Sequence, residues 1–373
     1  VVMQHNSKWL PFIFEFIYKN KTVYDCVLLY NFDHIYNQYL TEQADWNIYY
    51  YNGKLWVFEF VKNSNWFDYN STINAELKLV NWKYNLVFNN SKTYVFNTDL
   101  KLEKINDNFW NTFSFTYNID LNLENIIESN YRVYTLSYNS NWKLISITDF
   151  NWNKVEFIYY STGETTWSEN DLKTIRITNW TSTKNINFTY TIWTDEITSH
   201  NIIKLIDSEN NTYVENTYDS SDRVSSQKFG NATINYTYTT DSNNKITQNS
   251  VVDREWNNVI YTYDSNWNTT KKIVVKTTWN SVYNYEYNSD NYITKEILPL
   301  WNWYTYKYDV NNNLIEKRQK SDVNSQNSND DIVTSYTYDL VFNKPTQIVT
   351  PNGAVINFEL DNNWNIIRKE TLW

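Results

Sequence analysis

The chain has 373 residues, a formal net charge of −10 and a sequence pI near 4.9. This acidic balance argues against a nucleic-acid-binding surface, which normally shows as a basic patch. Cys26 is the single cysteine, so an internal disulfide framework and a cysteine-based zinc site are excluded. His5, His34 and His200 are too scattered along the chain to suggest a metal cluster. No apolar run approaches the roughly 18 residues that a membrane span needs.

The N-terminal part of the chain contains only short apolar runs. Its strongest apolar run, Pro11 to Tyr18, is short and is interrupted by Glu15. The chain begins at Val1 without an initiator methionine, and it stops inside a repeat. We therefore expect the sequence to be a fragment of a longer protein.

Farther along the chain, the sequence is predicted to form a row of β-hairpins. A Tyr-x-Tyr-Asp unit recurs at intervals of about 20 to 30 residues, a spacing typical of repeat architectures. Clear copies occupy 261–264, 306–309 and 336–339, and looser copies occupy 216–219, 236–239, 285–288 and 358–361. A polar stretch near 321–331 is predicted to be a loop insertion.

Within each unit the side chains alternate with period 2. Tyr283, Tyr285 and Tyr287 share one face of a predicted strand, whereas Asn284 and Glu286 lie on the other. A lone hairpin is at best marginally stable in water, so stacking is expected to bury the tyrosine faces and make the array cooperative. The Asp that ends each unit is expected to bond its own backbone at the turn rather than to act in catalysis.

Tryptophan stands where glycine is expected. The chain has 18 Trp and 4 Gly, whereas glycine would usually number about 26 in a chain of this length. Asn-Trp-Asn occurs at 151–153, 266–268 and 363–365, and further Asn-Trp pairs lie at 65–66, 81–82, 141–142 and 179–180. Tight hairpin turns favour Asn-Gly because they need a positive φ.

We therefore hypothesise that many of these tryptophans are glycines in the cell, at UGA codons reassigned to glycine. The alternative is a protein that is truly rich in tryptophan, for example one that stacks sugars on indole rings. The hypothesis predicts that Trp152, Trp267 and Trp364 lie at hairpin turns and are largely exposed.

If Trp is read as Gly, the unit Tyr-x-Tyr-Asp-x-x-Gly-Asn resembles the YD repeat of the Rhs family. Residues 261–268 and 138–153 then become close to consensus copies, and segments between residues 10 and 111 resemble the β-rich region that precedes the repeats in Rhs proteins. The chain departs from the family pattern at Cys26 and Leu29, where glycine is frequent. Asn244 and Asn313 stand in place of glycine at later turns.

The resemblance covers nearly the whole chain and implies an all-β fold. Consecutive antiparallel β-hairpins would form a spiralling β-sheet shell, a YD-repeat solenoid, either closed or incompletely closed. It implies two domains, a pre-repeat region at 1–111 and a repeat shell at 112–373. In bacterial members of the family the shell encloses a C-terminal toxin. The implied role is therefore a non-catalytic shell segment, extracellular or at the cell surface, whose partners are its own missing C-terminal core and toxin.

Two other functions remain open. A surface adhesin or carbohydrate-binding repeat protein would use the aromatic content, which is 18% of the residues, and its partner would be a cell-surface glycan or a receptor. An enzyme is the third possibility. However, the sequence nominates no catalytic, cofactor-binding or metal-binding residue, because nothing in it forms a nucleophile–His–acid set, a phosphate loop or a metal cluster.

Overall fold

The computed structural model describes residues 2–5, 11–19, 32–63, 66–70, 72–88, 92–109, 111–164, 170–191, 200–300, 302–320, 330–339, 344–361 and 366–372. Every regular element within these ranges is a β-strand. None of the described segments is a helix long and apolar enough to cross a membrane. The prediction of an all-β fold built from consecutive antiparallel hairpins is therefore confirmed. Cys26, Trp364 and most of the predicted insertion at 321–331 lie outside the described residues.

The chain divides into two compact units. The first comprises Val1–Val224 with Lys228–Asn231, and the second comprises Ser225–Gln227 with Ala232–Trp373. The boundary predicted from the resemblance, between residues 111 and 112, separates a pre-repeat region from the repeats. It is a different kind of division from these compact units, and it stays a prediction.

Short strands open the first unit and form three small antiparallel sheets, β1 with β2, β3 with β4, and β5 to β7. Their bounds are β1 Met3–His5, β2 Phe12–Phe14, β3 Phe16–Tyr18, β4 Phe32–His34, β5 Gln38–Glu42, β6 Ile48–Asn52 and β7 Val57–Phe60.

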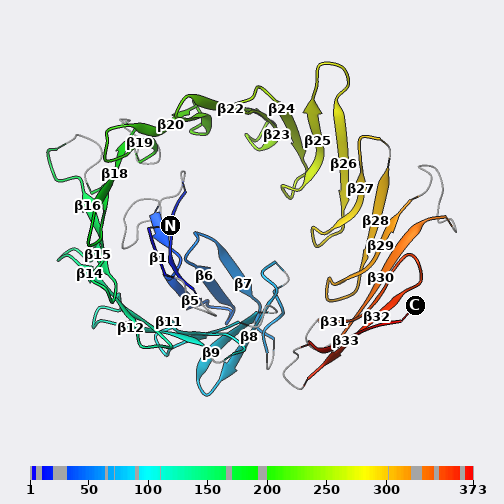
Figure 1. The fold of residues 1–373 in the computed structure, drawn as a ribbon, viewed down its shortest axis with the longest axis horizontal. Helices are drawn as coiled ribbons and strands as arrows, with labels where there is room; N and C mark the ends of the chain where they lie inside the picture. Colours follow the sequence, from blue (N-terminus) through cyan, green and yellow to red (C-terminus); the bar gives the residue numbers. More distant parts are fainter. Residues whose placement is uncertain are drawn as a thin grey trace. The chain divides into compact units, whose positions relative to one another are not determined.

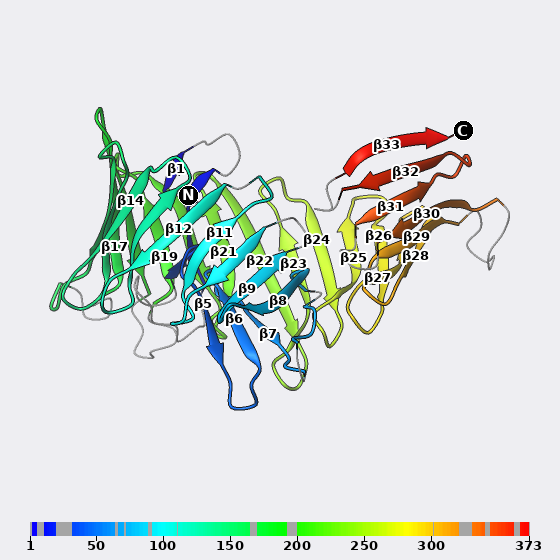
Figure 2. The ribbon, with the colours of Figure 1, turned by 90° about the horizontal axis from the view of Figure 1, so that it is seen from below.

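A long antiparallel sheet makes up the rest of the first unit, and each strand from β8 to β20 pairs with the next strand in the chain. The strands are β8 Ala75–Val80, β9 Lys83–Phe88, β10 Thr93–Phe96, β11 Leu102–Asn106, β12 Thr112–Tyr117, β13 Leu123–Glu128, β14 Val133–Tyr138, β15 Leu144–Thr148, β16 Lys154–Tyr159, β17 Leu172–Thr178, β18 Thr183–Tyr190, β19 Ile202–Ile206 and β20 Thr212–Tyr218. This sheet curves around the strands β1 to β7 (Figure 1). The β5–β6 hairpin extends past its edge (Figure 2).

The core of the first unit lies between the short N-terminal strands and the concave face of the sheet. Phe12 and Phe14 come from β2, while Leu86, Leu144 and Ile147 come from the sheet, and all five are fully buried. Burying apolar area of this kind contributes about 25 cal/mol per Å². The N-terminal strands therefore supply the apolar side chains that pack against the concave face of the curved sheet.

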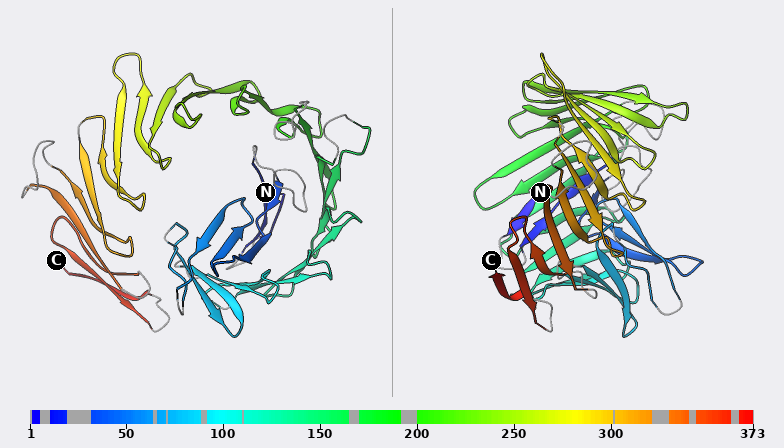
Figure 3. Two further views of the ribbon diagram at one scale, coloured as in Figure 1. Left: turned by 180° about the vertical axis from the view of Figure 1, so that it is seen from behind. Right: turned by 90° about the vertical axis from the view of Figure 1, so that its right-hand side faces the viewer.

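The second unit continues the same hairpin pattern, and each strand from β22 to β33 pairs with the next. Figure 3 shows these strands side by side in chain order. The bounds are β21 Val224–Phe229, which the unit boundary crosses, β22 Ala232–Thr240, β23 Ile246–Val252, β24 Asn258–Tyr263, β25 Thr269–Val275, β26 Ser281–Tyr287, β27 Ile293–Ile297, β28 Trp303–Tyr308, β29 Leu314–Gln319, β30 Ile332–Tyr338, β31 Pro345–Val349, β32 Val355–Leu360 and β33 Ile366–Leu372.

Side chains in both units alternate between the two faces of the sheet as predicted. In β26, Tyr285 and Tyr287 are half-buried while Glu286 between them is exposed. The equivalent aromatic positions of the first unit, such as Phe113 and Phe115 of β12, are buried because the N-terminal strands cover them. The same sequence pattern thus gives a face with buried aromatic side chains in the first unit and a face with half-buried ones in the second.

The turns are mostly longer than the two-residue hairpins that Asn-Gly pairs favour. In the common form, called the five-residue turn below, the N–H of the first residue donates to the carbonyl of the fifth, and the N–H of the fourth donates back to the carbonyl of the first. At Asp264–Asn268 these N···O distances are 3.0 and 3.3 Å. The fourth residue has positive φ, as at Trp267 (φ 68°). This is the geometry of a type I turn followed by a left-handed residue.

Three expectations about particular turn residues need correction. The left-handed residue of the turn after β28 is Asn312 (φ 61°), and not Asn313, because the fourth position of the turn and not the fifth takes that conformation. Trp180 has no positive φ, since its turn closes one residue earlier, with Asn179 N donating to Ser182 O at 3.0 Å. Trp66 likewise has no positive φ.

Candidate functional site

One hydrogen bond recurs between neighbouring strands and is made by a tyrosine that ends its strand. Its hydroxyl donates to the backbone carbonyl of the first residue of the preceding strand. The pairs, with O···O distances, are Tyr117–Leu102, Tyr138–Leu123, Tyr159–Leu144 and Tyr190–Leu172 at 2.7 Å, Tyr218–Ile202 and Tyr308–Ile293 at 2.8 Å, and Tyr287–Thr269 at 2.9 Å. We call this set the tyrosine seam.

The tyrosine seam needs protonated phenols, because only the neutral hydroxyl can donate. Burial raises the pKa of Tyr117 above its ordinary value, and burial raises that of Tyr218 to about 12. The seam hydroxyls therefore stay protonated at physiological pH. Each hydroxyl donates to a carbonyl next to a turn, where a register shift interrupts the hydrogen-bond ladder of the sheet. For example, Ile293, whose carbonyl accepts from Tyr308, lies opposite the shift between Glu286 and Tyr287.

The repeated Asp organises the five-residue turn, as the sequence predicted. Asp264 Oδ1 accepts from the N–H of Asn266 at 2.8 Å and from that of Asn268 at 2.9 Å, and its Oδ2 accepts from Asn268 Nδ2 at 3.0 Å. A side-chain hydrogen bond and backbone bonds from Asn257 and Glu255 lower the pKa of the equivalent Asp253 carboxyl. These carboxylates hold the backbone of the turn.

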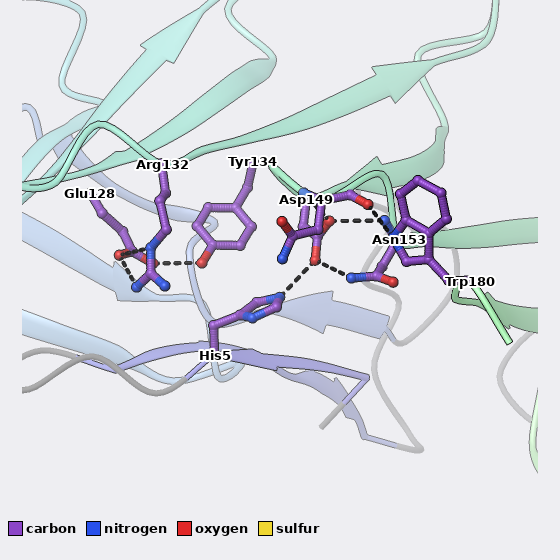
Figure 4. A network of polar contacts seen from close by, with 8 residues as sticks. His5, Glu128, Arg132, Tyr134, Asp149, Asn153 and Trp180 are labelled. Atoms are coloured by element: carbon purple, nitrogen blue, oxygen red, sulfur yellow. Dashed lines mark hydrogen bonds and ion pairs between the residues drawn. The ribbon is translucent and has the colours of Figure 1, made fainter.

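A polar network joins the N-terminal strand β1 to the sheet (Figure 4). His5 Nε2 lies 2.7 Å from Asp149 Oδ2, and the Asp149 side chain is fully buried. Asp149 begins the five-residue turn between β15 and β16. It also accepts from the N–H groups of Asn151 and Asn153 at 2.8 Å and from Asn153 Nδ2 at 2.7 Å. One carboxylate thus shapes a turn and holds the N-terminal strand.

Beside it, Glu128 gathers two donors from the neighbouring strand and turn (Figure 4). Arg132 Nε and Nη2 lie 2.8 and 2.5 Å from Glu128 Oε2, and Tyr134 Oη lies 2.5 Å from Glu128 Oε1. Burial raises the pKa of Tyr134, and the hydrogen bond to Glu128 raises it further. The Arg132 guanidinium also lies over the ring of Phe150 at 4.8 Å. Glu128 is buried, whereas Arg132 is partly exposed. The buried carboxylate is fully engaged by its donors, which offsets the cost of its desolvation.

A second polar contact holds the N-terminal strand β3. Tyr18 Oη donates to the carbonyl of His200 at 2.9 Å, and His200 Nδ1 lies 3.0 Å from both oxygens of Asp171. Burial raises the pKa of Tyr18 far above its ordinary value, and burial also raises the pKa of the Asp171 carboxyl. His200, which lies near the start of β19, is thus paired inside the wall.

Aromatic packing fills the space between these two polar contacts. The ring of Phe12 stacks on Tyr134 with centroids 3.6 Å apart and planes 10° apart. Phe16 meets Phe157 edge-on at 4.9 Å, and Phe32 meets Phe188 edge-on at 5.9 Å. Aromatic pairs of this kind add about 0.5–1.5 kcal/mol each beyond their area burial. Together with the two polar contacts they form what we call the N-terminal clasp.

The three histidines occupy separate environments. His5 pairs with Asp149, His200 pairs with Asp171, and His34 is buried against Phe14 with ring centroids 4.9 Å apart. Burial lowers the pKa of His34 to about 3. Within the described ranges, no three His, Cys, Asp or Glu side chains are placed to hold a metal ion. The arrangement of these groups can fasten strands to one another, and this is the chemistry they perform here.

Sequence reasoning did not find the tyrosine seam or the N-terminal clasp. The seam had a signal, because six of the seven repeat copies have tyrosine at the second aromatic or apolar position, and Leu360 stands there in the copy at 358–361. The clasp had none, since His5 and Asp149 are 144 residues apart and neither stands in a motif with the other.

No family model and no curated protein matches the sequence. Among solved structures, a TcdB2-TccC3 crystal structure is similar at 10% identity and a TM-score of 0.48, over 91% of this chain. A TcdB2-TccC3-TEV structure gives 9%, 0.44 and 89%, and a Photorhabdus luminescens Tc holotoxin pore gives 9%, 0.43 and 82%. The chain spans about a fifth of each of these chains, covering 21%, 21% and 20% of their lengths. Each of these TM-scores lies below 0.5.

Proposed function

We propose that this chain is a non-catalytic wall segment of an Rhs/YD-repeat shell. The shell belongs to a secreted or cell-surface bacterial protein that contains and delivers a C-terminal toxin. The tyrosine seam is the observation that carries the proposal. It ties one hairpin to the strand before it in both units, so a row of weak hairpins becomes a continuous wall. The seam includes Tyr218, Tyr287 and Tyr308, which end three of the units that resemble the YD repeat.

The way the polar groups are used supports a mechanical role. The turn carboxylates, such as Asp149 and Asp264, accept hydrogen bonds from backbone N–H groups. Glu128 is engaged by Arg132 and Tyr134. These groups stabilise strands and turns, and no nucleophile is placed beside an activating base among them.

The tyrosine-bearing face of the sheet differs between the two units in a way that suits a container. In β26, the tyrosine side of the second unit is half-buried and carries neighbours such as Lys272 of β25, whose Nζ lies 5.3 Å from the ring centroid of Tyr283. A mixed aromatic and charged lining leaves an enclosed polypeptide hydrated. By contrast, the apolar lining of the first unit is already occupied by the chain's own N-terminal strands.

Limited proteolysis of the full-length protein tests the proposal. If the shell encloses the region that follows this segment, that region resists protease in the intact protein. It is cleaved after the triple substitution Tyr117→Phe, Tyr138→Phe and Tyr159→Phe, which removes three seam bonds. Tyr131→Phe is the matched control, because Tyr131 is an exposed turn residue. Equal cleavage of the following region in all three proteins would contradict containment.

A surface adhesin or carbohydrate-binding protein is the second candidate. One observation favours it: ten of the eleven described tryptophans have exposed side chains, and exposed indole rings can stack on sugars. A glycan-binding assay on this segment tests it. Saturable binding that is lost when Trp152 and Trp267 are replaced together by alanine would favour the adhesin, and its absence would favour the shell.

A further inference from the structure

We propose that six tryptophan positions, 46, 82, 142, 152, 256 and 267, carry glycine in the natural protein, at UGA codons that its cell reads as glycine. The inference concerns the chain itself and stands apart from the proposed shell function. The sequence suggested such a replacement for tryptophans in general. The backbone conformation now assigns it to particular residues.

All six residues have a left-handed backbone. Their φ angles lie between 63° and 69°: Trp46 69°, Trp82 63°, Trp142 63°, Trp152 64°, Trp256 63° and Trp267 68°. A residue with a Cβ atom meets the following carbonyl oxygen in this region, at a cost of roughly 1–2 kcal/mol, whereas glycine enters it freely. Tryptophan is among the least suited residues for such a position.

Two turn types impose this conformation. Trp46, Trp142, Trp152, Trp256 and Trp267 each occupy the fourth position of a five-residue turn, and the N–H of each donates to the first carbonyl at 3.0–3.3 Å. Trp82 is different, because Asn81 and Trp82 form a two-residue turn between the paired residues Val80 and Lys83, and both have positive φ. That turn is the one for which Asn-Gly is the preferred pair.

Other turns of the chain show which residue the position takes. Gly353 occupies the same fourth position, with φ 84° and its N–H 3.0 Å from Thr350 O. Asparagine, which tolerates the left-handed region, fills it at Asn210, Asn244 and Asn291. All four glycines of the sequence, including Gly53, have positive φ. Glycine where it is printed and tryptophan at these six turns thus share one conformation.

The bias is specific to tryptophan among the aromatic residues. Leu100, Leu121 and Tyr131 also have positive φ, so these turns accept a bulky side chain at a cost. Among the described aromatic residues, however, six tryptophans, one tyrosine and no phenylalanine have positive φ. A preference for large rings at turns would favour all three residue types, whereas one reassigned codon affects tryptophan alone.

The six side chains have exposed fractions between 49% at Trp142 and 86% at Trp82. They also do not gather on one surface. Trp142 lies in the turn between β14 and β15, and Trp152 lies in the next turn, between β15 and β16. Consecutive turns of an antiparallel sheet lie at opposite edges. The positions therefore follow turn geometry rather than a ligand-binding surface.

Trp303 differs from the six and is not part of the assignment. It begins β28, is half-buried, and lies under the ammonium group of Lys295 with Nζ 4.9 Å from the ring centroid. The distinction is the backbone, because Trp303 has no positive φ. A cation over the ring does not separate it, since Lys245 Nζ also lies 5.4 Å from the ring centroid of Trp267.

Two measurements on the natural gene and protein test the proposal. The coding DNA is expected to have UGA at all six positions, and peptide mass spectrometry of the protein from its own cells is expected to find glycine in the peptide that contains residues 264–268. UGG codons at most of the six positions, or a tryptophan mass in that peptide, would overturn the assignment. Trp303 serves as the internal control, for which a UGG codon is expected.

Discussion

His5 Nε2 and Asp149 Oδ2 lie 2.7 Å apart and connect the start of the chain to a turn 144 residues further along. The same carboxylate accepts two backbone N–H groups of its turn. The fold of that turn and the position of the N-terminal strand are therefore coupled through one side chain.

This coupling is measurable by a double-mutant cycle. We expect His5→Ala to lower the free energy of unfolding by about 1 kcal/mol, and Asp149→Ala to lower it by about 2–3 kcal/mol because buried donors of the turn lose their acceptor. The double variant should lose less than the sum, with an interaction energy above about 0.5 kcal/mol. Urea unfolding of the four proteins gives the cycle, and strictly additive losses would show that the contact is not energetically coupled.

The tyrosine seam predicts a cost for removing a single oxygen atom. Tyr159→Phe keeps the ring but leaves the carbonyl of Leu144 without its donor, so the free energy of unfolding should fall by about 1–2 kcal/mol. Tyr131→Phe, at an exposed turn residue, should change it by less than about 0.5 kcal/mol. Urea denaturation measures both. Equal values for the two variants would mean that the seam bonds contribute nothing.

Replacing tryptophan by glycine should have opposite signs at two kinds of turn. Trp267→Gly relieves a residue with φ 68° and should stabilise the protein by about 1 kcal/mol. Trp279 is also exposed but has no positive φ, so Trp279→Gly should destabilise it by about 0.5–1 kcal/mol, since glycine loses more backbone freedom on folding. Urea midpoints of the two variants decide the matter, and a loss of stability in both would speak against strain at Trp267.

His34 should make stability depend on pH. Its pKa is about 3 in the folded state because of burial, against an ordinary 6.5, so the unfolded chain binds the proton more strongly. Stability is then complete above the unfolded pKa and is lost as pH falls from 6.5 toward 3, by up to about 1.4 kcal/mol per pH unit.

Urea unfolding of the natural protein and of His34→Phe across this pH range measures the contribution of His34. The ring of His34 stacks on Phe14, so phenylalanine keeps an aromatic ring there and removes only the titration. We expect a shallower loss of stability in the variant. An unchanged pH dependence would show that His34 is not the group responsible.

Local features of this fold were readable from the sequence. The alternation through Tyr285 and Tyr287 predicted strands, and the Asp of each unit predicted a capped turn, because both depend on residues only a few positions apart. One turn position was misassigned: Asn312 rather than Asn313 takes the left-handed conformation, although Asn312 is the residue that stands at the glycine of the unit Tyr-x-Tyr-Asp-x-x-Gly-Asn.

Long-range features were out of reach. The packing of Phe12 on Tyr134 and the pairing of His5 with Asp149 join segments more than a hundred residues apart. They depend on how the curved sheet surrounds its N-terminal strands, and a single sequence contains no pattern that relates the two partners.

The tyrosine seam always reaches back by one strand. At the seven junctions of the seam, a hairpin therefore brings its own attachment and supplies the carbonyl that its successor requires, as Tyr138 and Leu144 do from the two sides of one turn. The junction at Tyr263 differs, because its hydroxyl donates to Asn249 Oδ1. A gene that gained or lost a whole repeat within the seam would keep the remaining seam junctions intact. The number of repeats can thus vary during evolution without redesign of the neighbouring strands.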